Sequence, residues 1–269
     1  MELVSDTAIV TGGARGIGRG IAEELLAHGA SVAIADVNET GAEETAHELT
    51  EEFSPEAIPV KCDVTDADEV AAAVETTADE LGEVGILVNN AGVGELARTW
   101  ELTEEMWDQA VDVCLKGTFL CTREVINHML ETETDGAIVN VSSLNYRAPT
   151  DGLAHYSAAK AGVSQFTKVV AGEAGRHGIR VNAVAPGSTR TPLTEENELL
   201  SGKIGEEFLK RTVLGERFGE PEDVGRVVVF LASEYAGWVT GETICVDGGQ
   251  HIRGLHSYWD VLDEMGAFD

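Results

Sequence analysis

Residues 11–18 read Thr11-Gly12-Gly13-Ala14-Arg15-Gly16-Ile17-Gly18 and connect the first apolar run of the chain to its first amphipathic segment. Glycines allow the backbone to turn tightly and to approach a ligand closely. The N–H groups that open a helix lack partners inside the helix and attract phosphate. The spacing is Gly-x3-Gly-x-Gly, which differs from the commoner Gly-x-Gly-x-x-Gly. At this position we interpret the segment as a pyrophosphate-binding turn, for which an ordinary strand-to-helix turn is the alternative.

On both sides of this turn, short apolar runs alternate with longer amphipathic segments. The expected strands are residues 7–10, 31–35, 57–60, 84–88, 137–141, 179–184 and 243–246. The expected helices are residues 17–28, 39–52, 66–81, 103–130 and 155–177, with a further helix opening at Pro221. This alternation predicts an α/β fold in which helices cover both faces of a parallel sheet. Right-handed crossovers favour a doubly wound, Rossmann-like sheet of about seven strands in the order 3-2-1-4-5-6-7.

No linker or internal repeat divides the chain, so residues 1–269 are expected to form a single domain with a C-terminal tail over residues 250–269. The tail carries His251, Tyr258 and Trp259, and we expect it to serve in packing or subunit contact. A lid over the substrate is the alternative for this segment.

The charge of the chain is strongly unbalanced, with 48 Asp and Glu against 18 Lys and Arg and a formal net charge of -30. The acids recur along the expected helices, so they form a solvated coat that repels itself at low salt. At molar salt the Debye length falls to about 3 Å and this repulsion largely disappears. We therefore expect a protein of a salt-rich cytoplasm, as in halophilic microbes, with an ordinary acidic enzyme as the alternative. The chain has no basic stripe, which argues against nucleic acid as a partner.

The cysteines and the apolar runs indicate a cytoplasmic protein. Cys62, Cys114, Cys121 and Cys245 have neither metal-type spacing nor a disulfide framework, which fits a reducing compartment. No metal site is expected, because the histidines have no ligand cluster around them. The N-terminus lacks the features of a signal peptide. The apolar run over residues 227–232 is too short to span a membrane.

Asp36 ends the second expected strand, where a carboxylate can hydrogen-bond the ribose hydroxyls of a dinucleotide. A 2'-phosphate at this place would meet a negative charge, so NAD is favoured and NADP is less favoured. Val37, which is neither Arg nor Lys, supports the same choice. Arg15 is the counter-argument, because a guanidinium in the turn is close enough to meet a 2'-phosphate. A solvated loop acid is the plain alternative for Asp36.

The residues with catalytic chemistry are Ser143, Tyr156 and Lys160. Tyr156 and Lys160 are four residues apart on an expected helix and therefore share one face. A Lys ammonium stabilises a neighbouring phenolate, which makes the tyrosine a usable proton donor or acceptor. Ser143 follows a strand at the sheet edge where open α/β folds bind ligands, and it makes an otherwise common spacing specific. The adjacent His155 is expected to face outward or toward the substrate segment.

Together these motifs resemble the short, single-domain branch of the short-chain dehydrogenase/reductase family, over about residues 6–249. In chain order they are Thr11-Gly12-x3-Gly16-Ile17-Gly18, Asn89-Asn90-Ala91-Gly92, Ser142-Ser143, Tyr156-x3-Lys160, Pro186-Gly187, Arg217-Phe218-Gly219-Glu220-Pro221-Glu222-Asp223 and Val246-Asp247-Gly248-Gly249. The resemblance implies an NAD-dependent oxidoreductase that interconverts a secondary alcohol and its ketone. Tyr156 would move the proton while hydride moves to or from the nicotinamide.

The resemblance also implies a role for each matching residue. Ser143 would hydrogen-bond the substrate oxygen, and Lys160 would also hold the nicotinamide ribose. Residues expected to contact the cofactor are Gly12, Arg15, Gly16, Ile17, Gly18, Asp36, Val37, Asp63 and Val64 at the adenosine half, and Asn90, Ala91, Gly92, Tyr156, Lys160, Pro186, Gly187, Thr189 and Thr191 toward the nicotinamide.

Cys114 departs from the family pattern, because the family usually carries Asn there to hold a water chain that relays the proton from Lys160. A thiol is a poor hydrogen-bonding substitute for an amide. Activity survives if the backbone carbonyl carries the water, and the relay weakens if the amide is needed. A purely space-filling role on a buried helix face is the alternative.

The substrate is less well defined than the reaction. Residues 193–219 resemble the variable substrate segment of the family and mix acids with apolar residues. Asn145, Tyr146 and Arg147 place polar groups near the expected pocket mouth, which favours a polyol or sugar hydroxyl and its ketone or lactone. A 3-oxoacyl-thioester reductase is the alternative among enzymes. A non-catalytic NAD-binding scaffold or sensor is the alternative from another class, supported only by Cys114.

The resemblance further implies a homotetramer in which two long helices pair across subunits. The face compatible with such pairing comprises Ala158, Ala159, Val163, Phe166 and Val170.

Overall fold

The computed structural model describes residues 1–196, 200–215, 217–254, 261 and 264–266, and it confirms the predicted fold. The seven strands form one parallel sheet in the order β3-β2-β1-β4-β5-β6-β7. They are β1 (Thr7–Thr11), β2 (Ser31–Asp36), β3 (Ala57–Lys61), β4 (Ile86–Asn89), β5 (Gly136–Val141), β6 (Ile179–Pro186) and β7 (Thr243–Val246).

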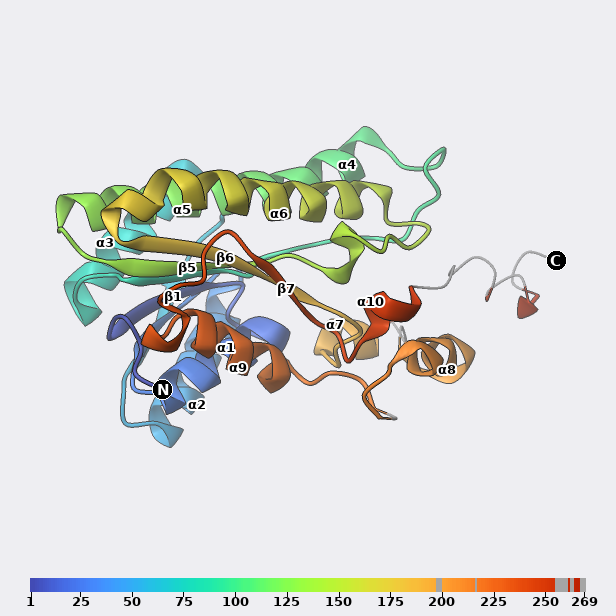
Figure 1. Cartoon of the computed structure of the whole chain (residues 1–269), viewed down its shortest axis with the longest axis horizontal. Helices are drawn as coiled ribbons and strands as arrows, with labels where there is room; N and C mark the ends of the chain where they lie inside the picture. Colours follow the sequence, from blue (N-terminus) through green and yellow to red (C-terminus); the bar gives the residue numbers. More distant parts are fainter. Residues whose placement is uncertain (197–199, 216, 255–260, 262–263, 267–269) are drawn as a thin grey trace.

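Helices cover both faces of this sheet (Figure 1). On one face lie α1 (Gly16–Ala27), α2 (Glu39–Glu52) and α9 (Pro221–Leu231), and on the other lie α3 (Ala67–Leu81), α4 (Glu104–Val111), α5 (Gly117–Glu131) and α6 (Ala154–Ala174). Successive residues of β1 point into different cores, since Ala8 and Val10 pack with α1 and α9 whereas Ile9 packs with α3 and α5. This double burial explains why the strands are continuously apolar. Among the described residues, no helix is long and apolar enough to cross a bilayer.

The predicted helix over residues 103–130 is wrong in one respect, because it is interrupted by a π-helical turn, η1 (Asp112–Lys116), between α4 and α5. Cys114 is the buried residue of this turn. A π-turn changes the hydrogen-bonding step from four residues to five and is frequent at functional sites. Directly after the turn the helix packs closely against the loop that follows β3, where a Cβ on Gly117 would lie 2.6 Å from Cγ2 of Val64.

The polar segment over residues 193–219 contains structure that its sequence pattern did not predict. A short helix, α7 (Pro192–Glu196), starts one residue before the segment and runs into it, and a second helix, α8 (Gly202–Arg211), lies within it. Phe208 and Phe218 form a small apolar cluster of their own with parts of this segment. After β7 the chain makes α10 (Gln250–Arg253), while Tyr258 and Trp259 of the tail lie outside the described residues.

The helix face predicted for subunit pairing is partly used within the chain itself. Ala159, Val163 and Val170 are buried at 1%, 0% and 7% exposure, so they cannot form an intersubunit surface. Periodicity alone does not tell a face that packs on its own sheet from one that packs on a partner.

Candidate active site

The pyrophosphate-binding turn predicted from the sequence sits at the carboxyl end of β1. Gly12 adopts a φ of 62°, and a Cβ there would lie 2.9 Å from the Ala91 Cα. Asn90 braces the turn, because its amide nitrogen donates to the carbonyl oxygens of Thr11 and Gly12 at 3.0 and 2.9 Å. Arg15 begins α1 without any side-chain hydrogen bond to the first turn. The N–H groups of that turn are thus left to bind an anion, and the residues present fit a dinucleotide.

Asp36 ends β2 beside this turn, as predicted. One of its carboxylate oxygens accepts from the Ala14 N–H at 3.1 Å and the other from the Asn38 N–H at 3.0 Å. The two backbone donors fix the carboxylate at the sheet edge, and each oxygen keeps a lone pair for a ligand hydroxyl. Val37 is 64% exposed beside it. Arg15 lies 3.4 Å from the Glu196 carboxylate, in an exposed ion pair on the substrate side of the turn.

The loop after β3 contains Asp63 and Val64, the pair expected near the adenine. Asp63 accepts from the backbone N–H and the hydroxyl of Thr65 at 2.9 and 2.8 Å, and these hydrogen bonds lower the pKa of the Asp63 carboxyl. Val64 is buried against the start of α5. Behind them, Cys62 is a core residue, and its burial raises the pKa of its thiol to about 12.

The loop after β6 brings the residues expected at the nicotinamide side next to the turn. A Cβ on Gly16 would lie 3.4 Å from the Thr191 Cβ, so the two loops are in contact. Gly187 donates its N–H to the Val246 carbonyl at 3.0 Å, and Thr189 donates its hydroxyl to the Gly187 carbonyl at 3.2 Å. Sequence-distant segments thus form one continuous edge, as expected for open α/β sheets.

Tyr156 and Lys160 share one face of α6, and Lys160 Nζ lies 5.7 Å from the centroid of the Tyr156 ring. Lys160 is 3% exposed and donates from Nζ to the Val141 carbonyl at 2.7 Å, so its ammonium is held beneath the ring at the end of β5. Ser143 follows β5, and its hydroxyl oxygen accepts from the Asn145 N–H at 3.2 Å. These groups suit proton transfer at a carbonyl or hydroxyl oxygen.

Cys114 reaches the same place from the π-helical turn. A Cβ on Gly92 would lie 3.3 Å from Lys160 Nζ and 3.5 Å from Cys114 Sγ, so both side chains contact this glycine. Cys114 is fully buried, and its thiol donates to the Val93 carbonyl at 3.4 Å. Its own carbonyl accepts from the Thr118 hydroxyl at 2.8 Å. The Cys114 side chain thus stands where the family usually carries an amide.

His155 differs from its prediction, because the side chain is buried at 1% exposure instead of facing outward. Its Nδ1 atom has no hydrogen-bond partner among the described residues. Burial lowers the pKa of the imidazole, against the opposing charge of Glu95. Neighbouring residues on a helix point about a hundred degrees apart, and at the start of α6 this turn places the His155 side chain in the interior.

A buried polar network under the catalytic edge was missed by the sequence reasoning. The Asn89 amide donates to the Thr122 hydroxyl at 2.9 Å and to the Asn140 side-chain oxygen at 2.8 Å. Asn140 in turn donates to the Thr167 hydroxyl at 2.9 Å. The network links β4, β5, α5 and α6, the elements around the catalytic edge, and fixes their relative position. The sequence signal was the presence of two Asn residues inside otherwise apolar strands.

The sequence reasoning also missed a second group of neighbouring polar side chains. It expected no cluster of ligand residues around the histidines. Cys245, Asp247 and His251 come together where β7 leads into α10. One ligand atom from each side chain lies within 4.8 Å of the others.

Comparison with known proteins identifies the family. Residues 12–251 match the family model described as "Enoyl-(Acyl carrier protein) reductase". The 3-oxoacyl-[acyl-carrier-protein] reductase FabG of Staphylococcus aureus (strain Mu50 / ATCC 700699) is 38% identical over 252 residues, covering 93% of this chain and 99% of that protein. The protein of the same name from Thermotoga maritima is 39% identical over 249 residues, covering 93% of this chain and 99% of that protein.

Among solved structures, a short-chain type dehydrogenase/reductase from Mycobacterium ulcerans is similar, with a TM-score of 0.92 at 30% identity. The match covers 98% of this chain and 96% of that one. The chain belongs to the short-chain dehydrogenase/reductase family, and it is an oxidoreductase.

Proposed function

We propose that the enzyme reduces the ketone of a 3-oxoacyl thioester to a hydroxyl, with NADH as the hydride donor. This replaces the polyol or sugar substrate favoured on sequence grounds. The support for a thioester is the similarity to 3-oxoacyl-[acyl-carrier-protein] reductases over 99% of their length. The observation that carries the reaction is the joint position of Tyr156, Lys160 and Ser143 at the sheet edge beside the pyrophosphate turn.

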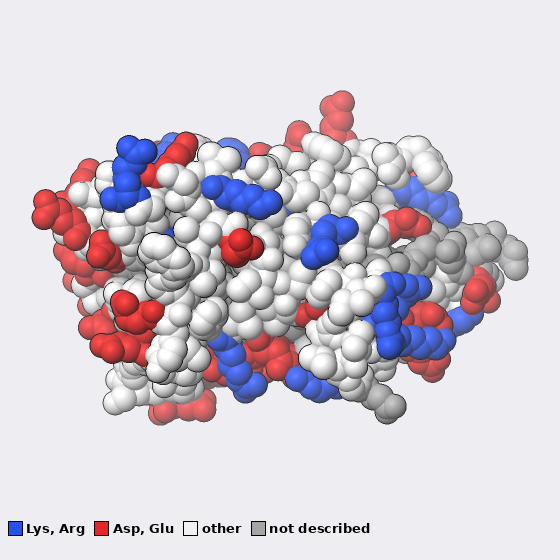
Figure 2. Space-filling model, viewed as in Figure 1, with Lys and Arg blue, Asp and Glu red and all other residues white. Residues whose placement is uncertain are grey.

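The basic side chains of the substrate segment also favour an anionic substrate. Figure 2 shows acidic side chains gathered toward the left of the view, and a group of basic ones, with acidic ones among them, where α8 and α10 lie. Arg211 donates to the carbonyls of Arg253 and Gly254, both at 3.2 Å, and Arg253 donates to the Lys210 carbonyl at 2.6 Å. Both guanidiniums are thus held by neutral carbonyls, so their positive charge can attract an anion. A phosphate-bearing thioester carrier suits this place better than a neutral sugar does.

The chain's own residues divide the reaction between them. A dinucleotide held by the pyrophosphate turn and Asp36 would supply the hydride when bound. The Ser143 hydroxyl donates a hydrogen bond to the carbonyl oxygen and holds it in place. Tyr156 gives its hydroxyl proton to that oxygen as the negative charge develops. The Lys160 ammonium stabilises the phenolate that is left, and the proton is restored from solvent.

The choice of NADH over NADPH follows from the fixed carboxylate of Asp36. Two backbone N–H groups hold the Asp36 carboxylate at the sheet edge, where the ribose hydroxyls are expected to bind. A 2'-phosphate would meet the negative charge of the same carboxylate. The ion pair of Arg15 with Glu196 reduces the attraction of Arg15 for a phosphate.

A polyol or sugar hydroxyl is the second candidate, and one observation favours it. Asn145 lies against Ser143 and also accepts from the Thr150 N–H at 3.0 Å through its side-chain oxygen. The substrate end therefore carries an ordered amide that suits a hydroxyl-rich ligand.

The test is a rate assay in molar potassium chloride with acetoacetyl-CoA and a panel of polyols and sugars, each with NAD(H) and NADP(H). We expect kcat/KM for acetoacetyl-CoA with NADH to exceed that of every polyol by at least about tenfold. Tyr156→Phe should lower kcat by about 10²–10⁴-fold and leave NADH binding intact, because only the proton donor is removed. Preferred oxidation of a polyol would move the assignment to the second candidate. Binding of NADH with no turnover in either protein would mark a scaffold and refute both.

We also propose that the acidic surface adapts the enzyme to molar salt and that the enzyme is a homotetramer. The tetramer is supported by Phe119 on α5 and Val169 on α6, which are 42% and 52% exposed on neighbouring helices. A cytoplasmic location stays a prediction from the sequence.

A further inference from the structure

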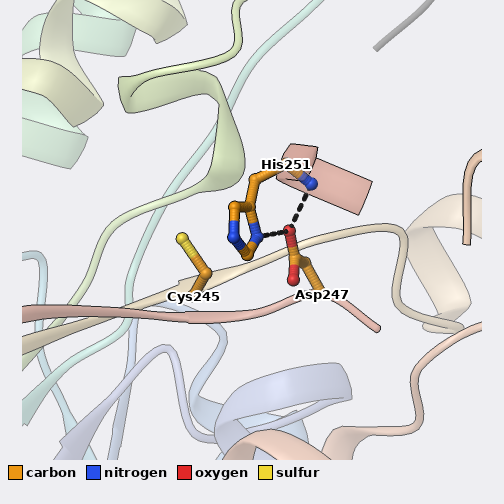
Figure 3. Close-up of side chains that lie close together, drawn as sticks. All are labelled: Cys245, Asp247 and His251. Carbon is orange, nitrogen blue, oxygen red and sulfur yellow. Dashed lines mark hydrogen bonds and ion pairs between the residues drawn. The ribbon is translucent and has the colours of Figure 1, made fainter. Parts of the chain in front are cut away.

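The group formed by Cys245, Asp247 and His251 has the arrangement of a nucleophile, a base and an orienting acid. The His251 Nδ1 atom lies 2.8 Å from an Asp247 carboxylate oxygen. In Figure 3 the imidazole lies between this carboxylate and the Cys245 sulfur, with its second ring nitrogen on the sulfur side. One side-chain atom from each of the three residues lies within 4.8 Å of the others. The distance between a nucleophile and its base is often longer than a hydrogen bond before a ligand binds.

Asp247 is anchored firmly enough to set the state of the imidazole. It is 3% exposed and accepts the backbone N–H groups of Gly249 at 3.0 Å and His251 at 2.7 Å in addition to the ring. A carboxylate can only accept, so Nδ1 of His251 must donate to it. In the neutral ring this leaves Nε2 as a proton acceptor on the side of Cys245.

Cys245 is the cysteine that a reagent can reach. The other three cysteines, Cys62, Cys114 and Cys121, are buried, whereas Cys245 is half-buried. The Tyr146 hydroxyl lies 4.0 Å from its sulfur. Tyr146 and Cys245 raise the pKa of the Arg147 guanidinium.

The hydrogen bonds of Asp247 argue against a metal centre made of these three side chains. Both oxygens of Asp247 already accept N–H groups, and a divalent cation would have to displace them.

We propose that Cys245 is a His251-activated nucleophile and a site of S-thiolation by small disulfides. His251 Nε2 removes the thiol proton, and the Cys245 thiolate attacks one sulfur of the disulfide. The new S–S bond forms as the old one breaks, and the leaving thiolate takes the proton from His251. The products are a mixed disulfide on Cys245 and one free thiol, so no further oxidant or reductant takes part.

The adduct would stand at the substrate end of the active edge. Cys245 on β7 is in register with Ala185 on β6, one residue before Pro186. Tyr146, which contacts the sulfur, belongs to the short turn η2 (Leu144–Tyr146) that follows Ser143 directly. We therefore infer that thiolation hinders substrate binding while the pyrophosphate turn stays free.

Thiol reactivity is measured first, without substrate, on the reduced native chain in molar potassium chloride with the aryl disulfide DTNB. We expect one fast thiol per chain, and Cys245→Ser should remove it. His251→Gln should slow it by about tenfold or more, because the base is lost and the polar shape is kept. His47→Gln, at an exposed histidine on α2, is the matched control and should leave the rate unchanged.

Two results would refute the proposal that His251 activates Cys245 as a nucleophile. The first is an equal rate in the parent chain and in His251→Gln. The second is a thiol that becomes fast only after EDTA treatment, which would identify a metal-bound sulfur. Because this readout needs no substrate, it stands apart from the proposed thioester reduction.

The second arm measures turnover and NADH binding after stoichiometric modification. Turnover should fall at least about tenfold with NADH binding retained, and Cys245→Ser should be active and resist the reagent. Full turnover after complete modification would refute the inference that the adduct hinders the substrate end.

Discussion

Replacing Asp36 with Asn tests the cofactor choice, because it removes one charge and keeps the shape of the side chain. The Asn oxygen can still accept the Ala14 N–H that now lies at 3.1 Å, whereas the exposed Asn38 N–H, now 3.0 Å from the other carboxylate oxygen, turns to water. What changes is the interaction with the ribose of the cofactor.

Two contributions set the size of the effect. Losing the charge-assisted part of the ribose hydrogen bonds costs about 1–1.5 kcal/mol. The carboxylate repels a 2'-phosphate about 6 Å away by about 4 kcal/mol at an effective dielectric of about 20, before salt is considered. Molar salt, with a Debye length of about 3 Å, reduces this repulsion to about 0.5 kcal/mol. The sum of about 1.5–2 kcal/mol corresponds to a loss of about 13- to 30-fold in preference for NADH over NADPH.

The assay compares kcat/KM for NADH and NADPH in the parent enzyme and in Asp36→Asn, at low and at molar salt. The parent's preference should fall as salt rises, whereas that of the variant should hardly change. Glu39→Gln removes the same charge from the exposed first turn of α2 and serves as the control. An unchanged preference in Asp36→Asn, or an equal change in Glu39→Gln, would refute the reasoning.

Three further predictions concern stability and the proton relay. Asn140→Leu takes from the Asn89 amide one of its two acceptors and from the Thr167 hydroxyl its donor, so it should cost about 2–4 kcal/mol and lower the Tm by about 4–16 °C in a thermal melt, with Thr122→Val costing less. Cys114→Asn should retain or raise kcat, since an amide can also donate to the Val93 carbonyl, and a folded but inactive variant would contradict this. Lowering potassium chloride from molar to millimolar should lower the Tm markedly, because 48 acids face 18 basic residues; a salt-independent Tm would remove the argument for a halophilic protein.

The sheet was predictable because the central strands are buried on both faces and the long helices on one. The runs expected over residues 31–35 and 137–141 differ from β2 and β5 by one residue at one end. The π-helical turn was not predictable, because its side chains follow almost the same periodicity as an α-helix. The close packing of Gly117, directly after the turn, on Val64 joins residues that are distant in sequence and has no local signal either.

The candidate site divides in the same way. Tyr156 and Lys160 were found because a spacing of four on one helix is a local signal. The Asn89–Asn140 hydrogen bond joins residues 51 positions apart and has no local signal. The Cys245–His251 group lies within seven residues but depends on a reversal at Gly248 and Gly249, whose φ values are 57° and 84°. A Gly-Gly pair flanked by Cys, Asp and His was the signal that could have revealed it.

The acidic coat and the proposed ligands pose an electrostatic problem that the site solves locally. A chain with a net charge of -30 repels a dinucleotide and an anionic thioester at long range, and this repulsion is weakest in molar salt. The attraction must then come from groups in direct contact, which salt screens least. Such groups are the free N–H donors at the start of α1, the buried ammonium of Lys160 and the guanidiniums of Arg211 and Arg253. High salt therefore removes the unfavourable long-range field and spares the short-range contacts, so ligand binding and surface charge favour the same environment.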